Sequence, residues 1–131
     1  MTKQLSDRID AFDMWCQRRI LRIPYTRHVT NAEVRSITGC FAASKLVRMR
    51  KLQIFGHLTR RSYEEDHHRV VVAAMSNPPA GWRRPRGRPR DIWLRTVSRD
   101  VQPFSTGVHT AWRLAADRRQ WRQVVDTAML Q

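Results

Sequence analysis

Apolar residues recur at helical spacing near the N-terminus, and this periodicity is the strongest limit on the fold. From residue 5 to residue 23 the intervals run 4, 3, 4, 4 and 3, which places the side chains on one face of an α-helix. Pro24 ends the segment, because proline lacks a backbone N–H and clashes with the preceding turn. The sequence therefore predicts a helix over 4–23. Its apolar positions are Leu5, Ile9, Phe12, Cys16, Ile20 and Ile23.

Two further helices follow Pro24. Thr30 and Glu33 have the spacing of a capping box, in which each side chain satisfies a free backbone donor of the first turn. Gly39 suits the C-terminal end of the same helix, because glycine adopts the left-handed conformation without strain. Segment 44–61 has apolar residues all around its helical circumference. This pattern predicts a helix that is packed on several sides or broken near Gly56.

The rest of the chain is also expected to be helical. A short helix is predicted over 65–75, and a linker rich in proline, glycine and arginine follows at 77–90. Apolar spacing after Ile92 and after Trp112 predicts the C-terminal helices, with Asp117 and Gln120 capping the last of them. The fold class is all-α, with about six short helices arranged as an N-terminal part (1–76), the linker (77–90) and a C-terminal part (91–131). The expected core includes Phe12, Leu52, Phe55, Leu58, Trp93, Trp112 and Trp121.

The charge of the chain favours an anionic partner. Its 131 residues include 25 Lys and Arg but only 11 Asp and Glu, which gives a formal net charge of +14. Nucleic acid is the partner class that such an excess favours most. No apolar run approaches the length of a membrane span, and the N-terminus lacks the apolar centre of a signal peptide. We therefore expect an intracellular protein, nuclear or cytoplasmic, with no membrane partner and no small-molecule substrate.

Groups that converge for catalysis or metal binding are missing from the sequence pattern. The neighbouring acids Glu64, Glu65 and Asp66 are typical of a helix entrance, where the dipole favours negative charge. The histidines that follow them, His67 and His68, are expected to pair with those acids or with solvent. No Cys/His spacing fits zinc. We expect no catalytic residue, no metal and no cofactor, and we expect Cys16 and Cys40 to be buried small apolar residues in a reducing compartment.

Four runs occur in the same order in one known family. They are "AFDMWCQRRILRIPYTRHVTNAEV", "RKLQIFGHLTRR", "GRPRDIW" and "DRRQWRQVV". Together they resemble the C-terminal part of LINE-type (non-LTR) retrotransposon endonuclease–reverse transcriptases, over about residues 8–129. The resemblance implies a segment that follows the polymerase palm, includes the thumb, and holds RNA or DNA without catalytic residues of its own. Because the chain opens at the edge of this region, we expect a truncated or degenerate copy.

The basic residues are the candidate binding site. Residues 83–90 place five arginines on an extended segment, which suits contact with phosphates. The core "PRGRP" at 85–89 also matches an AT-hook, in which arginines enter the narrow A·T-rich minor groove. A solvated helix entrance is a third interpretation of that segment. For the chain as a whole, the alternatives are a remnant with no function, an AT-hook-type DNA-binding protein and a module that binds an acidic protein. The candidate nucleic-acid-binding residues are Arg18, Arg19, Arg22, Arg50, Lys51, Arg60, Arg61, Arg83, Arg84, Arg86, Arg88 and Arg90.

Overall fold

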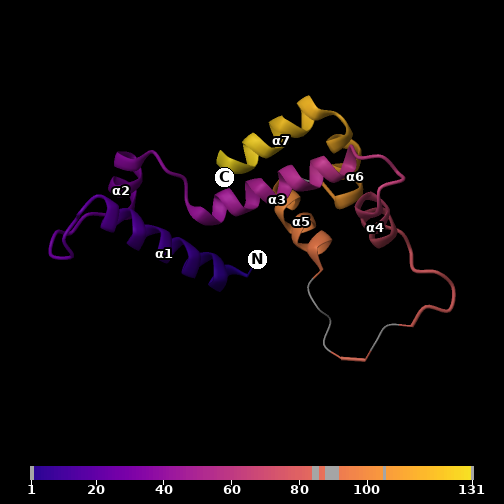
Figure 1. Cartoon of the computed structure of the whole chain (residues 1–131), viewed down its shortest axis with the longest axis horizontal. Helices are drawn as coiled ribbons and strands as arrows, with labels where there is room; N and C mark the ends of the chain where they lie inside the picture. Colours follow the sequence, from indigo (N-terminus) through magenta and orange to yellow (C-terminus); the bar gives the residue numbers. More distant parts are fainter. Residues whose placement is uncertain (1, 84–85, 88–91, 105, 131) are drawn as a thin grey trace. The chain divides into compact units, whose positions relative to one another are not determined.

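Helices are the only regular secondary structure in the described part of the chain. The computed structural model describes residues 2–83, 86–87, 92–104 and 106–130, and no strand occurs among them. The predicted all-α class is confirmed, with seven α-helices in the described residues (Figure 1). The helices are α1 (Lys3–Ile20), α2 (Asn31–Thr38), α3 (Ala43–Thr59), α4 (Asp66–Met75), α5 (Trp93–Val101), α6 (Val108–Ala116) and α7 (Arg118–Leu130), with a 3₁₀ turn at Gln102–Phe104.

The chain divides into two compact units within α3. Unit 1 is Met1–Arg48 and unit 2 is Met49–Gln131. The sequence instead suggested a division at the linker 77–90. The helices before and after that linker share one core in unit 2, because Phe55 of α3 packs against rings of α5, α6 and α7.

Unit 1 is held largely by polar contacts between α1, α2 and the start of α3. The carboxylate of Asp10 accepts hydrogen bonds from the backbone N–H and the hydroxyl of Ser44, at 2.9 and 2.7 Å. The buried Gln17 bonds Asp13 and Thr38, at 2.9 and 3.0 Å. Among the described residues of unit 1, the buried apolar side chains are those of Met14 and Val34. Side-chain hydrogen bonds therefore set much of the geometry of this unit.

The ends of α2 follow local sequence rules. Thr30 and Glu33 form the predicted capping box, with the Glu33 backbone N–H donating to the Thr30 hydroxyl at 3.2 Å. Gly39 ends the helix in the left-handed conformation, at φ +65°. Helix α1 ends at Ile20, three residues before its predicted end, and the chain turns through Arg22 at φ +54°.

Unit 2 has an aromatic core centred on Phe55. The Phe55 ring is fully buried and lies 6.0, 5.6 and 5.5 Å, between ring centroids, from Trp93, Trp112 and Trp121. Helix α3 continues through Gly56, so it is packed on several sides rather than broken. The buried residues of this core are Leu52, Phe55, Val71, Leu94, Val97, Val101, Ala111, Ala115, Trp121, Val125 and Ala128.

Some predicted burial is wrong. Phe12 lies on the surface of α1 with 65% of its area exposed, although its spacing matched the apolar stripe. Cys40 is exposed and Cys16 is half-buried, and both are free thiols. These residues belong to unit 1, whose short helices cover only part of α1. The periodicity of the sequence predicted the helix correctly. It did not show which apolar side chains of that helix are buried against another element.

Candidate nucleic-acid interface

Helices α3 and α7 line an open cleft in unit 2, which we call the α3–α7 cleft. Its volume is about 450 Å³. The α3 residues recur at intervals of 3, 1, 3 and 3 and the α7 residues at intervals of 3, 1, 3 and 1, so each set comes from one face of its helix. The lining consists of Arg50, Gln53, Ile54, His57 and Arg60 from α3, and Arg118, Trp121, Arg122, Val125 and Asp126 from α7.

The floor of the cleft is fixed by Trp121. Its indole N–H donates a buried hydrogen bond of 2.8 Å to the backbone carbonyl of Leu52. A methyl group on Gly56 would overlap Cδ1 and Nε1 of that indole. Glycine at position 56 thus allows the ring to lie directly on the α3 backbone, which sets the distance between the two helices.

Arginine dominates the charge of the cleft. Four arginines line it, and Asp126 is the one carboxylate among the lining residues. The guanidinium groups of Arg118 and Arg122 make no hydrogen bond or ion pair with another described residue. Clefts lined by one sign of charge concentrate the field and attract ions of the opposite sign. The planar guanidinium also matches the oxygens of phosphate or carboxylate groups in a bidentate manner.

Arg50 and Arg60 are partly engaged within unit 2. The Arg60 guanidinium donates a hydrogen bond of 2.7 Å to the carbonyl of Ala115 near the end of α6. Arg50 donates to the side chain of Gln53 at 3.1 Å. Both contacts are to neutral acceptors and use one guanidinium nitrogen. The positive charge of each residue is therefore not neutralised, and other donors stay available to an anion.

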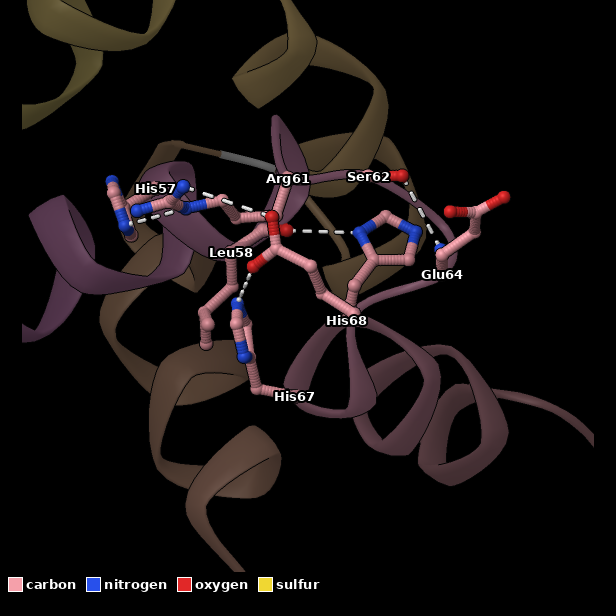
Figure 2. Close-up of polar contacts among 8 residues, drawn as sticks. His57, Leu58, Arg61, Ser62, Glu64, His67 and His68 are labelled. Atoms are coloured by element: carbon pink, nitrogen blue, oxygen red, sulfur yellow. Dashed lines mark hydrogen bonds and ion pairs between the residues drawn. The ribbon is translucent and has the colours of Figure 1, made fainter.

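A chain of side-chain contacts continues from the cleft toward α4 (Figure 2). Arg61 donates to Nε2 of His57 at 2.9 Å, and its guanidinium lies 3.7 Å from the Glu65 carboxylate. His67 pairs with the other Glu65 oxygen at 2.6 Å, as predicted for a histidine beside these acids. These contacts orient His57 at the cleft. They also pair Arg61 with residues inside unit 2.

His68 has a different environment from its neighbour. Its Nδ1 lies 2.9 Å from the carbonyl of Leu58 (Figure 2). Its ring packs against the rings of Tyr63 and Trp112. It thus helps to join the end of α3 to α4 and α6. No group of three or more His, Cys, Asp or Glu residues able to hold a metal ion occurs in the described part of the chain.

Two further residues predicted to bind nucleic acid, Lys51 and Arg18, also have internal partners. Lys51 forms an ion pair with Asp100 of α5, and both side chains are largely buried. Arg18 donates to the carbonyl of Val29 at 2.9 Å and to the side chain of Asn31 at 2.8 Å. Lys51 joins α3 to α5 within unit 2, whereas Arg18 fixes the loop between α1 and α2 in unit 1.

The remaining predicted cations lie elsewhere. Arg19 and Arg22 are exposed at the end of α1 in unit 1. In the linker, Arg83 and Arg86 are exposed, and Gly87 has a φ of +122°. Positions 84, 88 and 90, together with most of the predicted AT-hook core, lie outside the described residues. The tether and AT-hook interpretations therefore stay predictions.

Sequence reasoning missed two of the four arginines of the cleft. Arg118 and Arg122 stand four apart at the start of α7, so they share a face of the helix. The run "DRRQWRQVV" contained this signal, because arginine recurs on the same side as Trp121. What the sequence did not show is that α3 presents Arg50 and Arg60 to the same cleft.

Comparison with protein-family models, curated proteins and solved structures finds no significant match. The resemblance to retrotransposon reverse transcriptases therefore stays a prediction from the four sequence runs. No helix in the described residues combines the length and the apolar character needed to cross a membrane.

Proposed function

We propose that this protein binds the sugar–phosphate backbone of nucleic acid through the α3–α7 cleft and carries no catalytic residues of its own. The observation that supports this most is the pair Arg118 and Arg122, which line an open cleft without a partner among the described residues. Like charges repel when they share one face of a helix. A cleft of this kind is stabilised when an anion enters it.

Nucleic acid fits this cleft better than a small anion. The arginines are spread over two helices and both ends of α7's first turn, rather than gathered at one point. A polymer with regularly spaced phosphates contacts such a row with several groups at once. The net charge of +14 adds attraction at longer range. Contacts of this type position a protein on nucleic acid with little preference for sequence.

The resemblance to LINE-type reverse transcriptases supports the same function from an independent direction. In that family the matched region follows the polymerase palm and would hold template, primer or target. We propose that the chain derives from such a region and acts where nucleic acid is found, in the nucleus or the cytoplasm. This origin and the cleft are separate parts of the proposal, because the cleft depends only on the geometry of unit 2.

The test of the cleft compares two double variants. R118A/R122A removes two arginines of the cleft, whereas R113A/R119A removes two exposed arginines of α6 and α7 that do not line it. Both variants lose the same net charge. At 0.1 M salt we expect R118A/R122A to weaken binding of a labelled 20-base-pair duplex by at least about tenfold, because two phosphate contacts are lost. R113A/R119A should change it by about twofold or less.

Equal losses in the two variants would mean that only net charge matters, and the cleft would be excluded as the site. Two duplexes, one A·T-rich and one G·C-rich, separate the alternatives. Backbone contact predicts the same loss on both, whereas an AT-hook predicts selective binding of the first. Competition by polyglutamate as effective as that by duplex would instead favour an acidic protein as partner.

A further inference from the structure

Helix α1 carries an exposed aromatic pair in unit 1. Phe12 and Trp15 stand three residues apart, with 65% and 59% of their areas exposed. Their ring centroids are 6.0 Å apart and the ring planes differ by 21°, so the rings lie nearly parallel. Neither side chain contributes to the buried residues of unit 1, which leaves two large flat faces without a role in the fold.

Arginines flank this pair on the same face. Arg8 stands four residues before Phe12, and Arg19 stands four residues after Trp15, so all four residues follow one line along the helix. The Arg19 guanidinium carbon lies 5.9 Å from the centroid of the Trp15 ring, within the range of a cation–π contact. We call Arg8, Phe12, Trp15 and Arg19 the α1 stripe.

The acids of α1 lie off this stripe. Asp10 bonds Ser44 and Asp13 bonds Gln17, so both carboxylates are used inside unit 1. Asp7 stands one residue before Arg8, about 100° around the helix. The stripe is therefore positively charged and aromatic, with no carboxylate among its members. This charge matches a polyanion and disfavours a basic partner.

We infer that the α1 stripe binds unpaired nucleobases of single-stranded nucleic acid by stacking, with Arg8 and Arg19 contacting the adjacent phosphates. Alternation of aromatic rings and cations is what single-strand binding requires, because every base offers a flat face and every nucleotide a phosphate. An apolar protein partner would account for the rings but not for the arginines. The inference deepens the proposed function by adding a contact specific for unpaired bases, on a unit separate from the cleft.

The test uses three ligands of equal phosphate number per strand: a 20-nucleotide dT oligomer, an abasic 20-mer with the same backbone, and a 20-base-pair duplex. The variant F12L/W15L keeps apolar side chains on the helix but removes both rings. We expect it to weaken binding of the dT oligomer by about tenfold or more, because each stacked ring contributes roughly that much. Binding of the abasic 20-mer and of the duplex should change by about twofold or less.

A second variant keeps the test independent of folding. F12Y/W15F retains two aromatic rings, so it should bind the dT oligomer within about threefold of the unaltered protein. The inference is overturned if F12L/W15L weakens the binding of all three ligands equally, or the binding of none of them. It is also overturned if F12L/W15L changes only the oligomeric state, because the stripe would then pair two copies of the chain.

The cleft and the stripe fail in different ways. R118A/R122A should weaken the binding of all three ligands alike, because the cleft contacts the sugar–phosphate backbone that they share. If R118A/R122A binds duplex normally while F12L/W15L weakens binding of the dT oligomer alone, the stripe is retained as a binding site and the cleft is excluded. The opposite result retains the cleft and removes the stripe.

Discussion

The two units use the same residue types in opposite ways. In unit 2 the rings of Trp93, Trp112 and Trp121 each contact the Phe55 ring, and apolar side chains from all five helices of the unit join this core. In unit 1 the aromatic pair of α1 lies on the surface, and polar contacts hold the helices together. Aromatic content alone therefore does not show where a core forms.

The difference follows from how many helices are present to cover each face. In unit 2, helices α4, α5, α6 and α7 all supply apolar neighbours to the core in which Leu52 and Phe55 of α3 are buried. Unit 1 has α2 and the first turns of α3 to cover an 18-residue helix. Part of α1 stays uncovered, and arginine and aromatic side chains occupy that surface. A surface that folding does not use is available for binding.

The largest expected effect is on the core of unit 2. Phe55→Ala removes the ring that contacts three tryptophans, and burial of this kind contributes about 3–5 kcal/mol to the free energy of unfolding. Phe12→Ala removes the same side chain from the surface of unit 1 and should change that free energy by about 0.5 kcal/mol or less. Denaturant unfolding followed by tryptophan fluorescence measures both. Similar losses would contradict the contrast between the units.

A smaller effect is expected from the glycines. Gly56→Ala should destabilise the protein by about 1–3 kcal/mol, because the new methyl overlaps Trp121. Helix propensity alone would predict a gain of about 1 kcal/mol, so the sign of the change decides between packing and propensity. In unit 1, Gly39 has open space around it and only its positive φ opposes a side chain. Gly39→Ala should lower the free energy of unfolding by about 1 kcal/mol.

Much of the fold could be predicted from the sequence because its signals are local. The capping box at Thr30 and the C-terminal end at Gly39 depend on residues within a few positions. Likewise, the Asp117 carboxylate accepts hydrogen bonds from the backbone N–H groups of Arg119 and Gln120, and so caps the start of α7 as predicted for Asp117. The all-α class followed from such signals and from helical spacing, since each of them acts within a turn or two.

The candidate site could be predicted only in part, because it depends on contacts that are distant in sequence. Leu52 and Trp121 lie 69 residues apart, yet their hydrogen bond places Arg60 and Arg118 on one cleft. Lys51 resembled the other cations of α3, and its pairing with Asp100 depends on the position of α5. A single sequence shows that these cations exist but not which of them meet.

The smallest expected effect concerns the capping box of unit 1. The Thr30 backbone N–H, and next its hydroxyl, donate to the Glu33 carboxylate and hold its pKa below the ordinary value of 4.5. A lowered pKa in the folded state means that the ionised carboxylate stabilises α2 above about pH 4.5. That contribution is lost as the pH falls through the folded-state pKa.

Glu33→Gln should therefore be less stable than the unaltered protein at pH 6 and should approach its stability near pH 2. Amide hydrogen exchange in α2 at the two pH values, each corrected for intrinsic exchange rates, measures the difference. Glu64→Gln changes the same charge at an exposed position outside α2 and serves as the control. A Glu33→Gln protein whose stability differs from the unaltered one by a constant amount at every pH would contradict this account.

The central claim is that the arginines of the α3–α7 cleft contact phosphates, and the salt dependence of duplex binding tests it most directly. Each contact contributes about −0.9 to the slope of log affinity against log salt concentration. R118A/R122A should therefore reduce the magnitude of that slope by about 1.8, whereas R113A/R119A should leave it unchanged. A slope that is the same for R118A/R122A and the unaltered protein would show that these arginines do not touch phosphates, and the claim would be wrong.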